Sequence, residues 1–261
     1  MSNDLVHYDL QHRTAILTLN RPDRRNALSR ELITALHAAV ERAADDIHAR
    51  CVVLTGAGTT FCAGMDLAEL QESMAARADE SPVWDDALHL GKLYDRLYRL
   101  PKPTIAAVNG AAVAGGAGLV TVCDLALAVP EARLGYPGVR RGLVAALVMP
   151  HLLRHVGERM ARYLLLTGEL IDAEEARRAG LLNAVVSQKM LIEKAINWSR
   201  SLAEGGPEAL SRTKELLIQF SSQSVSIEEA AQASAAPRLS DECREGLRAF
   251  FAKQPAPWAP R

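Results

Sequence analysis

The sequence predicts an α/β protein in which helices cover parallel strands and a helical region follows at the C-terminal end. Short apolar runs rich in β-branched residues alternate with segments of helical periodicity, which is typical of chains that build parallel sheets. From residue 189 onward only helical patterns occur. We therefore expect a core over residues 1–200 and a helical appendage over residues 201–261.

The composition agrees with a folded domain and excludes several kinds of partner. The chain has 261 residues, 49% of them hydrophobic, which allows a substantial core. A net charge of −1 gives no reason to expect nucleic-acid or membrane binding. Four scattered cysteines indicate neither a disulfide framework nor a metal site. The first residues lack the pattern of a signal peptide, so we expect a cytoplasmic protein.

The first elements are a hairpin, a capped helix and a buried strand. Two alternating runs, Leu5–Leu10 and Thr14–Leu19, predict strands joined by a turn at residues 11–13. Ser29 predicts the N-cap of a helix. The predicted buried face of that helix consists of Leu32, Ile33, Leu36, Ala39, Val40 and Ala43. Cys51–Thr55 is then expected to form a buried strand.

A turn over residues 61–67 follows that strand and leads into a further helix. Asp66 and Glu69 have the spacing of a capping box, so Asp66 is interpreted as a helix cap rather than as a catalytic acid. The polar residues 71–86 are expected to form a mobile loop over a binding pocket. The next predicted helix buries Leu90, Leu93, Tyr94 and Leu97.

The central stretch, residues 103–124, is apolar, but its glycines and Asn109 argue against a membrane span. It divides into a strand (Thr104–Val108), a glycine-rich turn (Asn109–Gly116) and a helix (Gly116–Cys123). The N–H groups that begin this helix would stabilise a negative charge at the turn. The turn also fits a simple packing role, and no Lys-Ser/Thr pair follows it as in a phosphate loop.

The second half continues with a strand, a turn and a series of helices. Leu125–Val129 is a predicted strand, and Tyr136–Gly138 a turn back toward the first two turns. The later predicted elements are helices at Met149–Val156, Glu158–Thr167 and Asp172–Arg178, a strand at Leu181–Val186, and helices at Lys189–Leu202, Pro207–Phe220, Ile227–Ala235 and Glu242–Ala252. Gly157, Gly168 and Gly180 lie at boundaries that favour a left-handed residue, and Asp172 and Glu175 form another capping box.

Several motifs, in order along most of the chain, resemble the crotonase family of enoyl-CoA hydratases and isomerases. They are "LTLNRPDRRNALS", "TFCAGMDLAEL", "PKPTIAAVNGAAVAGGAGLVTVCDLALA", "LLLTGELIDAEEARRAGLLNAVV" and "DECREGLRAFFAKQPAPW". The resemblance implies a spiral of ββα turns, a C-terminal trimerisation region, and assembly as a homotrimer or a dimer of trimers. It also implies an acyl-CoA thioester as substrate, with no cofactor beyond the coenzyme A of that substrate.

The resemblance also assigns residues to the site. It places the backbone N–H groups of Met65 and Gly115 on the thioester oxygen, where an enolate would carry charge. It places residues near the coenzyme A at Arg24, Ala27, Ala63, Asp66, Leu67 and Ala68. Arg21 and Arg25 are further candidates for the phosphates, although each could equally belong to a solvated basic loop.

The chain departs from the family at the two catalytic glutamates, because Gly118 and Gly138 occupy those positions. Hydration needs an acid and a base, and glycine supplies neither. Three hypotheses follow: a hydratase or isomerase with displaced acid/base groups or a lost glutamate, an enzyme of enolate chemistry such as acyl-CoA decarboxylation, or a non-catalytic acyl-CoA-binding protein. The titratable residues that could substitute are Tyr136, Arg140, Asp85, Asp86, His89 and His151, each of which fits a structural role better.

Overall fold

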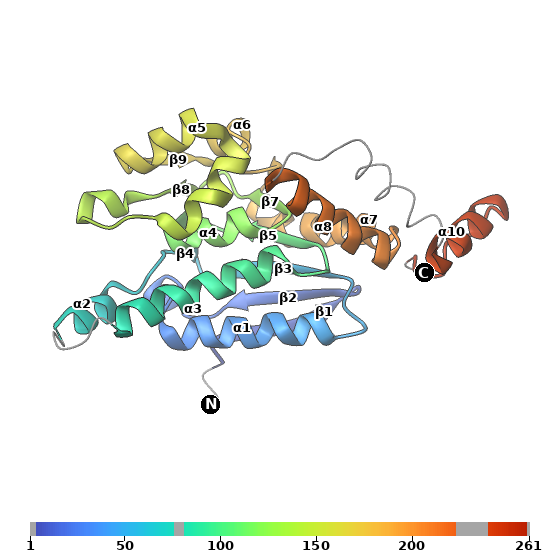
Figure 1. Ribbon diagram of the computed structural model, residues 1–261, viewed down its shortest axis with the longest axis horizontal. Helices are drawn as coiled ribbons and strands as arrows, with labels where there is room; N and C mark the ends of the chain where they lie inside the picture. The colour runs from blue at the N-terminus through green and yellow to red at the C-terminus, as the bar shows by residue number, and fades with distance from the viewer. Residues whose placement is uncertain (1–3, 76–80, 223–239, 260–261) are drawn as a thin grey trace.

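The computed structural model describes residues 4–75, 81–222 and 240–259, and it contains two sheets with helices around them (Figure 1). The strands of the larger sheet lie in the order β1-β2-β3-β5-β7-β10, and those of the smaller sheet in the order β4-β6-β8-β9. The larger sheet comprises β1 (Val6–Gln11), β2 (Thr14–Leu19), β3 (Cys51–Gly56), β5 (Thr104–Val108), β7 (Leu125–Ala128) and β10 (Ala184–Val185). The smaller sheet comprises β4 (Thr60–Cys62), β6 (Ala111–Val113), β8 (Arg133–Gly135) and β9 (Leu170–Asp172).

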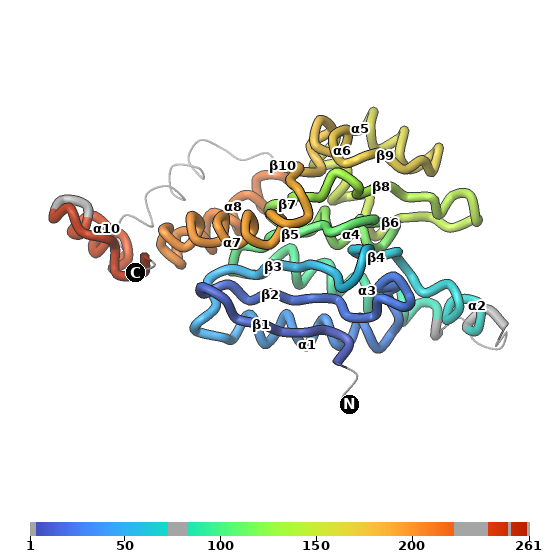
Figure 2. The backbone as a smooth tube through the Cα atoms, turned by 180° about the vertical axis from the view of Figure 1, so that it is seen from behind, coloured from blue at the N-terminus to red at the C-terminus, as the bar shows by residue number. Residues whose placement is uncertain are grey.

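The larger sheet confirms the predicted hairpin and parallel strands. β1 pairs antiparallel with β2, and the strands from β2 through β10 pair parallel with one another. Figure 2 shows the strands of this sheet side by side. Its central strands are buried along nearly their whole length, as expected for a parallel sheet.

Helix α1 (Arg30–Asp45) forms as its sequence predicts. The Ser29 hydroxyl accepts a hydrogen bond from the Leu32 N–H at 3.2 Å, and the six residues of the predicted apolar face are all buried. α1 and α3 (Ser81–Tyr98) lie side by side on one side of the larger sheet (Figure 1). The predicted residues of α3, from Leu90 to Leu97, are buried as well.

The predicted loop over residues 71–86 is wrong. Helix α2 (Leu67–Ala75) extends into that range, α3 already begins at Ser81, and residues 76–80 lie outside the described chain. The start of α3 was not predicted because its side chains are polar and contact polar partners, which gives no apolar periodicity. Asp86 receives two hydrogen bonds, each 2.6 Å long, from the Arg30 guanidinium at the start of α1.

The smaller sheet was not predicted, because each of its strands has only three residues. So short a run shows no alternation of its own. β4 pairs parallel with β6, and β6 with β8, so the chain segments that follow these strands emerge at the same edge. One of these segments is helix α4 (Gly115–Val122), which begins one residue earlier than predicted.

The helices after β8 follow the predicted glycine boundaries. α5 (Met149–Thr167) is interrupted at Gly157, whose φ of 68° and ψ of 172° are not helical, and it ends at the left-handed Gly168. Gly180 also has a positive φ, of 92°. α6 (Ala173–Arg178) begins after Asp172, whose side chain accepts from the Glu175 N–H.

The C-terminal region contains α7 (Leu191–Ala203), α8 (Pro207–Ser222) and α10 (Asp241–Phe251). The buried Lys214 of α8 forms a 2.7 Å ion pair with Asp124, which follows α4. Glu242 of α10 accepts hydrogen bonds from the Glu208 and Ala209 N–H groups at the start of α8. The predicted helix Ile227–Ala235 lies outside the described residues. Within the described chain, no helix is both long and apolar enough to cross a membrane.

Candidate functional site

Two turns of the smaller sheet meet at the centre of the candidate site. The turn after β4 contains Gly64, and the turn after β6 contains Ala114 and Gly115. Gly64 has a φ of 91°, and a methyl group placed on it would lie 2.7 Å from the Val113 carbonyl oxygen and 3.3 Å from the Gly115 nitrogen. The two backbones therefore approach each other as closely as they do because residue 64 has no side chain.

The Met65 and Gly115 N–H groups have no hydrogen-bond acceptor within the described part of the chain. Their neighbours are engaged: the Leu28 N–H donates to the Gly64 carbonyl, and the Asp66 N–H donates to the Leu28 carbonyl. Gly115 is the first residue of α4, where N–H groups have no partner within the helix. Both residues line one cavity.

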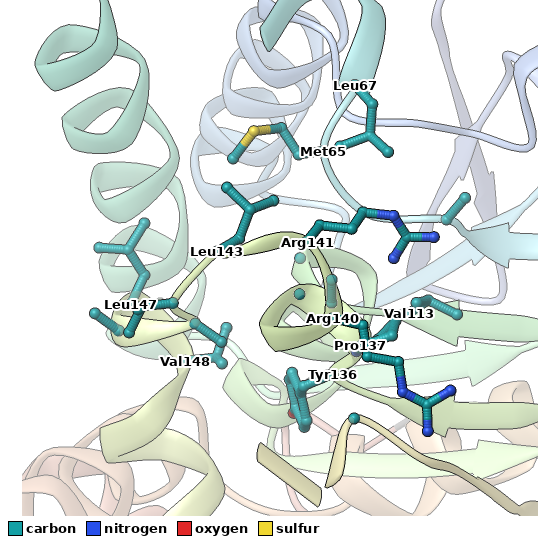
Figure 3. A pocket seen from close by; sticks show the side chains of 18 of the residues that line it. Met65, Leu67, Val113, Tyr136, Pro137, Arg140, Arg141, Leu143, Leu147 and Val148 are labelled. Carbon is teal, nitrogen blue, oxygen red and sulfur yellow. The ribbon is translucent and has the colours of Figure 1, made fainter. Parts of the chain in front are cut away.

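That cavity has a volume of about 700 Å³ and a largely apolar wall. Figure 3 shows Leu143, Leu147 and Val148 grouped on one side and the guanidinium groups of Arg140 and Arg141 on the other. The turn after β8 brings Tyr136 and Gly138 to the same cavity, because β8 pairs with β6 and the Ala114 N–H donates to the Gly135 carbonyl at 2.8 Å.

Ala114, which precedes α4, has a strained backbone. Its φ of 49° and ψ of −113° belong to a region that favours glycine. This conformation lets the chain leave β6 and begin α4 with Gly115 at the cavity. Strained residues of this kind concentrate at functional sites, where the surrounding structure holds them in place.

We expect Ala114→Gly to raise the free energy of unfolding by about 1 kcal/mol, because glycine adopts this conformation without the steric cost. Denaturant unfolding would measure it. Ala112→Gly on the neighbouring strand β6 is the control: Ala112 is fully buried and has no positive φ, so the same exchange should destabilise the protein. If Ala114→Gly is less stable than the unmodified protein, the claim that Ala114 is strained is wrong.

Gly118 and Gly138, the positions at which the resemblance implies catalytic glutamates, have different surroundings. Gly138 lines the cavity, and a methyl group on it would lie 3.4 Å from Leu143 Cβ, an ordinary contact. A methyl group on Gly118 would lie 2.5 Å from Val148 Cγ1 and 2.6 Å from the Tyr94 hydroxyl oxygen. Position 138 therefore has room for a side chain, and position 118 does not.

Two buried tyrosines lie at the cavity, and the sequence identified only Tyr136 as a candidate. The Tyr94 hydroxyl donates to the Gly115 carbonyl at 2.7 Å. The Tyr136 hydroxyl has no hydrogen-bond partner among the described residues. Burial raises the pKa of Tyr94 and of Tyr136, so both hydroxyls stay protonated at neutral pH and can act as donors but not as bases.

Of the other titratable candidates, Asp85, Asp86, His89 and His151 do not line the cavity. Asp86 is paired with Arg30, and both of them line a separate depression together with Asp85 and His89. His151 packs edge-on against Tyr98, and burial lowers its pKa to about 4. Arg140 does line the cavity, and Glu169, which the sequence did not suggest, is the one carboxyl group among its described lining residues. Within the described chain, no group of three or more His, Cys, Asp or Glu residues is placed to hold a metal ion.

The residues expected near the coenzyme A divide into two groups. Ala63, Leu67 and Arg25 line the cavity, whereas Arg24, Ala27, Asp66 and Ala68 do not. Arg21 is committed to a structural role, because its guanidinium forms a 2.6 Å ion pair with Asp66 and donates to the Ala27 carbonyl. That pair lies beside the turn that carries Met65.

Asp66 is a helix cap, as predicted, since its side chain accepts from the Ala68 N–H at 3.1 Å. Burial alone would raise its pKa, but the hydrogen bonds from Arg21 and Ala68 outweigh burial and lower it. The capping box itself does not form in the predicted way. Glu69 accepts from the Arg30 N–H at the start of α1, and the Asp66 N–H donates to Leu28 instead.

Comparison with known proteins gives a consistent result. The family model described as "Enoyl-CoA hydratase/isomerase" matches residues 10–261. A Thermus thermophilus protein, provisionally assigned as an enoyl-CoA hydratase, is 44% identical over 92% of this chain and 95% of its own length. The 2,3-dehydroadipyl-CoA hydratase of Escherichia coli is 34% identical, covering 94% of both chains. The crystal structure of a Mycobacterium smegmatis enoyl-CoA hydratase superposes with a TM-score of 0.87 at 33% identity, covering 97% of this chain and 98% of that chain.

Proposed function

The chain belongs to the enoyl-CoA hydratase/isomerase family, and from that premise we propose that it binds an acyl-CoA thioester and stabilises the enolate of its acyl group. In this proposal the thioester oxygen accepts hydrogen bonds from the Met65 and Gly115 N–H groups. The observation that carries it is the meeting of the two turns at one cavity, where neither N–H group has an acceptor among the residues that the structure describes.

The chemistry follows from where charge develops. When a proton or a carboxylate leaves Cα, or a nucleophile adds to the conjugated double bond, negative charge moves onto the thioester oxygen. Fixed amide donors at that oxygen stabilise the charge by about 3–4 kcal/mol for each strong donor, because they need no reorganisation during the reaction. Since the donors are backbone groups, the side chain of Met65 is free to vary, whereas Gly64 and Gly115 are constrained by close packing.

The missing carboxylates limit the reaction that the site can support. Hydration of an enoyl thioester needs a base for the water and an acid for Cα, and neither Gly118 nor Gly138 supplies one. The hydroxyls of Tyr94 and Tyr136 are held protonated, so neither replaces the base. We therefore propose enolate stabilisation without efficient two-glutamate hydration.

Decarboxylation of a malonyl-type thioester is the second candidate function. In that reaction the Cα–carboxylate bond breaks, CO₂ leaves, the electron pair becomes the enolate, and Cα then takes a proton from water. No protein base is required. The observation that favours it is the charge of the cavity. Arg25, Arg140 and Arg141 line it, with one carboxyl group among the described lining residues, so an anionic acyl group would be attracted rather than repelled.

A screen with two substrates and one binding assay tests these proposals. Crotonyl-CoA reports hydration and methylmalonyl-CoA reports decarboxylation, while calorimetry with each thioester reports binding. We expect both thioesters to bind, with slow turnover of crotonyl-CoA. Binding without turnover of either would support a non-catalytic acyl-CoA-binding protein. Failure to bind any CoA thioester at millimolar concentration, where binding worth about 4 kcal/mol is detectable, would contradict the proposed function.

We also propose that the chain assembles as a homotrimer or a dimer of trimers through its C-terminal helices. Leu217 and Phe220 of α8 and Leu247 of α10 are 65%, 38% and 52% exposed, which is costly for large apolar side chains in one region. Sedimentation at micromolar concentration should give three or six chains per particle, and a monomer would contradict this assembly.

A further inference from the structure

We propose that Tyr94 is a positioning residue of the acyl-CoA site, whose hydroxyl holds the first turn of α4 so that the Gly115 N–H points at the thioester oxygen. This inference rests on the proposed function and adds to it a side chain that neither the family match nor the sequence motifs single out. It also gives Gly118 a role: the glycine makes room for that hydroxyl.

The first support is how the Tyr94 hydroxyl packs against α4. α3 and α4 lie side by side (Figure 1), and Tyr94 extends from α3 to the beginning of α4. Gly115 and Gly118 are three residues apart, so both lie on the same face of that helix. A methyl group on Gly115 would lie 3.2 Å from the Tyr94 hydroxyl oxygen, and one on Gly118 would lie 2.6 Å from it. The hydroxyl therefore fills a groove that these two glycines leave open.

The second support is the backbone that the hydroxyl binds. Three of the first four residues of α4 are glycine, which gives this turn more conformational freedom than other helical residues would have. The residue before them, Ala114, is strained. Because glycines give this first turn conformational freedom and the residue before it is strained, a contact from outside the helix is needed to hold one geometry. The 2.7 Å hydrogen bond from Tyr94 to the Gly115 carbonyl is such a contact, and it is protected from water because Tyr94 is 2% exposed.

The consequence concerns the orientation of the donor more than ligand affinity. Most of a CoA thioester would contact other parts of the site, so losing the tether should leave binding nearly intact. The Gly115 N–H would instead sample several directions, and a donor that is not fixed polarises the thioester less. Tyr94→Phe isolates this effect, because it keeps the ring that fills the space below α4 and removes only the hydroxyl.

The experiment uses 4-(dimethylamino)cinnamoyl-CoA, a thioester whose absorbance moves to longer wavelength when its carbonyl is polarised. We expect the unmodified protein to cause a clear red shift. Tyr94→Phe should bind the same compound with a Kd within about threefold of the unmodified protein, but give a red shift smaller by about half or more. Tyr98→Phe, the same exchange one turn further along α3, is the matched control and should leave the shift unchanged.

A second variant keeps the test decisive if Tyr94→Phe does not fold. Gly118→Ala retains the tyrosine but displaces its hydroxyl from α4, so it should also reduce the red shift. If Tyr94→Phe folds and keeps the full red shift, the role of Tyr94 is overturned, while the proposed donors stand. If Tyr94→Phe is unfolded, a full red shift in Gly118→Ala has the same meaning. Absence of any shift in the unmodified protein would overturn the proposed donors and, with them, this inference.

Discussion

Gly138→Glu is expected to raise the rate of crotonyl-CoA hydration by about 10²–10⁴-fold, the usual contribution of one well-placed general acid or base. Position 138 lines the cavity together with Tyr136 and Pro137. The Cβ of a side chain there would make an ordinary contact with Leu143. Gly138 does not have a positive φ, so a side chain fits its backbone. The resemblance to the family places a catalytic glutamate at this position. The measurement is the hydration rate at saturating substrate.

Gly118→Glu is the matched comparison, and we expect it to help less than Gly138→Glu or to impair the protein. Its Cβ would collide with Val148 and with the Tyr94 hydroxyl, which is bound to the Gly115 carbonyl. If Gly118→Glu is the faster variant, or if neither exceeds the parent, this account of the missing acid/base groups is wrong. A parent that hydrates crotonyl-CoA at about tens per second, a common enzyme rate, would require another acid or base. Glu169 lines the cavity as a candidate base, and the protonated Tyr136 as a candidate acid only.

Gly64→Ala is expected to lower hydration by about 10²–10³-fold in the Gly138→Glu background, the loss measured elsewhere when one oxyanion donor is removed. The added methyl group would lie 2.7 Å from the Val113 carbonyl oxygen, so the two turns must separate. The Met65 N–H and the Gly115 N–H could then no longer reach the same oxygen. The red shift of the bound cinnamoyl thioester should fall with the rate.

Gly142→Ala separates this effect from the general cost of a side chain at positive φ. Gly142 has a φ of 72°, and nothing lies within 4 Å of the methyl group that the substitution adds. It should therefore cost stability, by about 1 kcal/mol, without a comparable loss of rate. Equal losses of rate in the two variants would show that backbone strain, and not the approach of the two turns, explains the result.

The parts of the fold that the sequence predicted are those specified by local patterns. α1 has a side-chain cap at Ser29 and a continuous apolar face, and both signals are complete within its own residues. The glycine boundaries of α5 are equally local, because a glycine with a positive φ marks each of them. The strands of the smaller sheet depend instead on pairing between segments far apart in the chain, as between β4 and β6, and their three residues carry no periodicity.

The backbone turns of the site could be predicted from the sequence, whereas its side-chain contacts between distant segments could not. Glycines and the family resemblance identified the turns at Met65 and Gly115. They could not show that Tyr94 packs against Gly118, because the two residues lie on different helices, 24 positions apart in the chain. The pattern of the sequence also fits Tyr94 as an ordinary core residue. The contacts of Arg21 and Glu69 could not be predicted for the same reason. Their partners, Asp66 and the Arg30 N–H, are set by tertiary packing and not by sequence spacing.

The most direct test of the central claim is the structure of the protein with a bound acyl-CoA thioester or a non-reactive analogue. The account predicts that the thioester oxygen lies within about 3.2 Å of both the Met65 nitrogen and the Gly115 nitrogen, with the acyl group in the cavity beside Gly138. A thioester oxygen beyond hydrogen-bond reach of both nitrogens would contradict it.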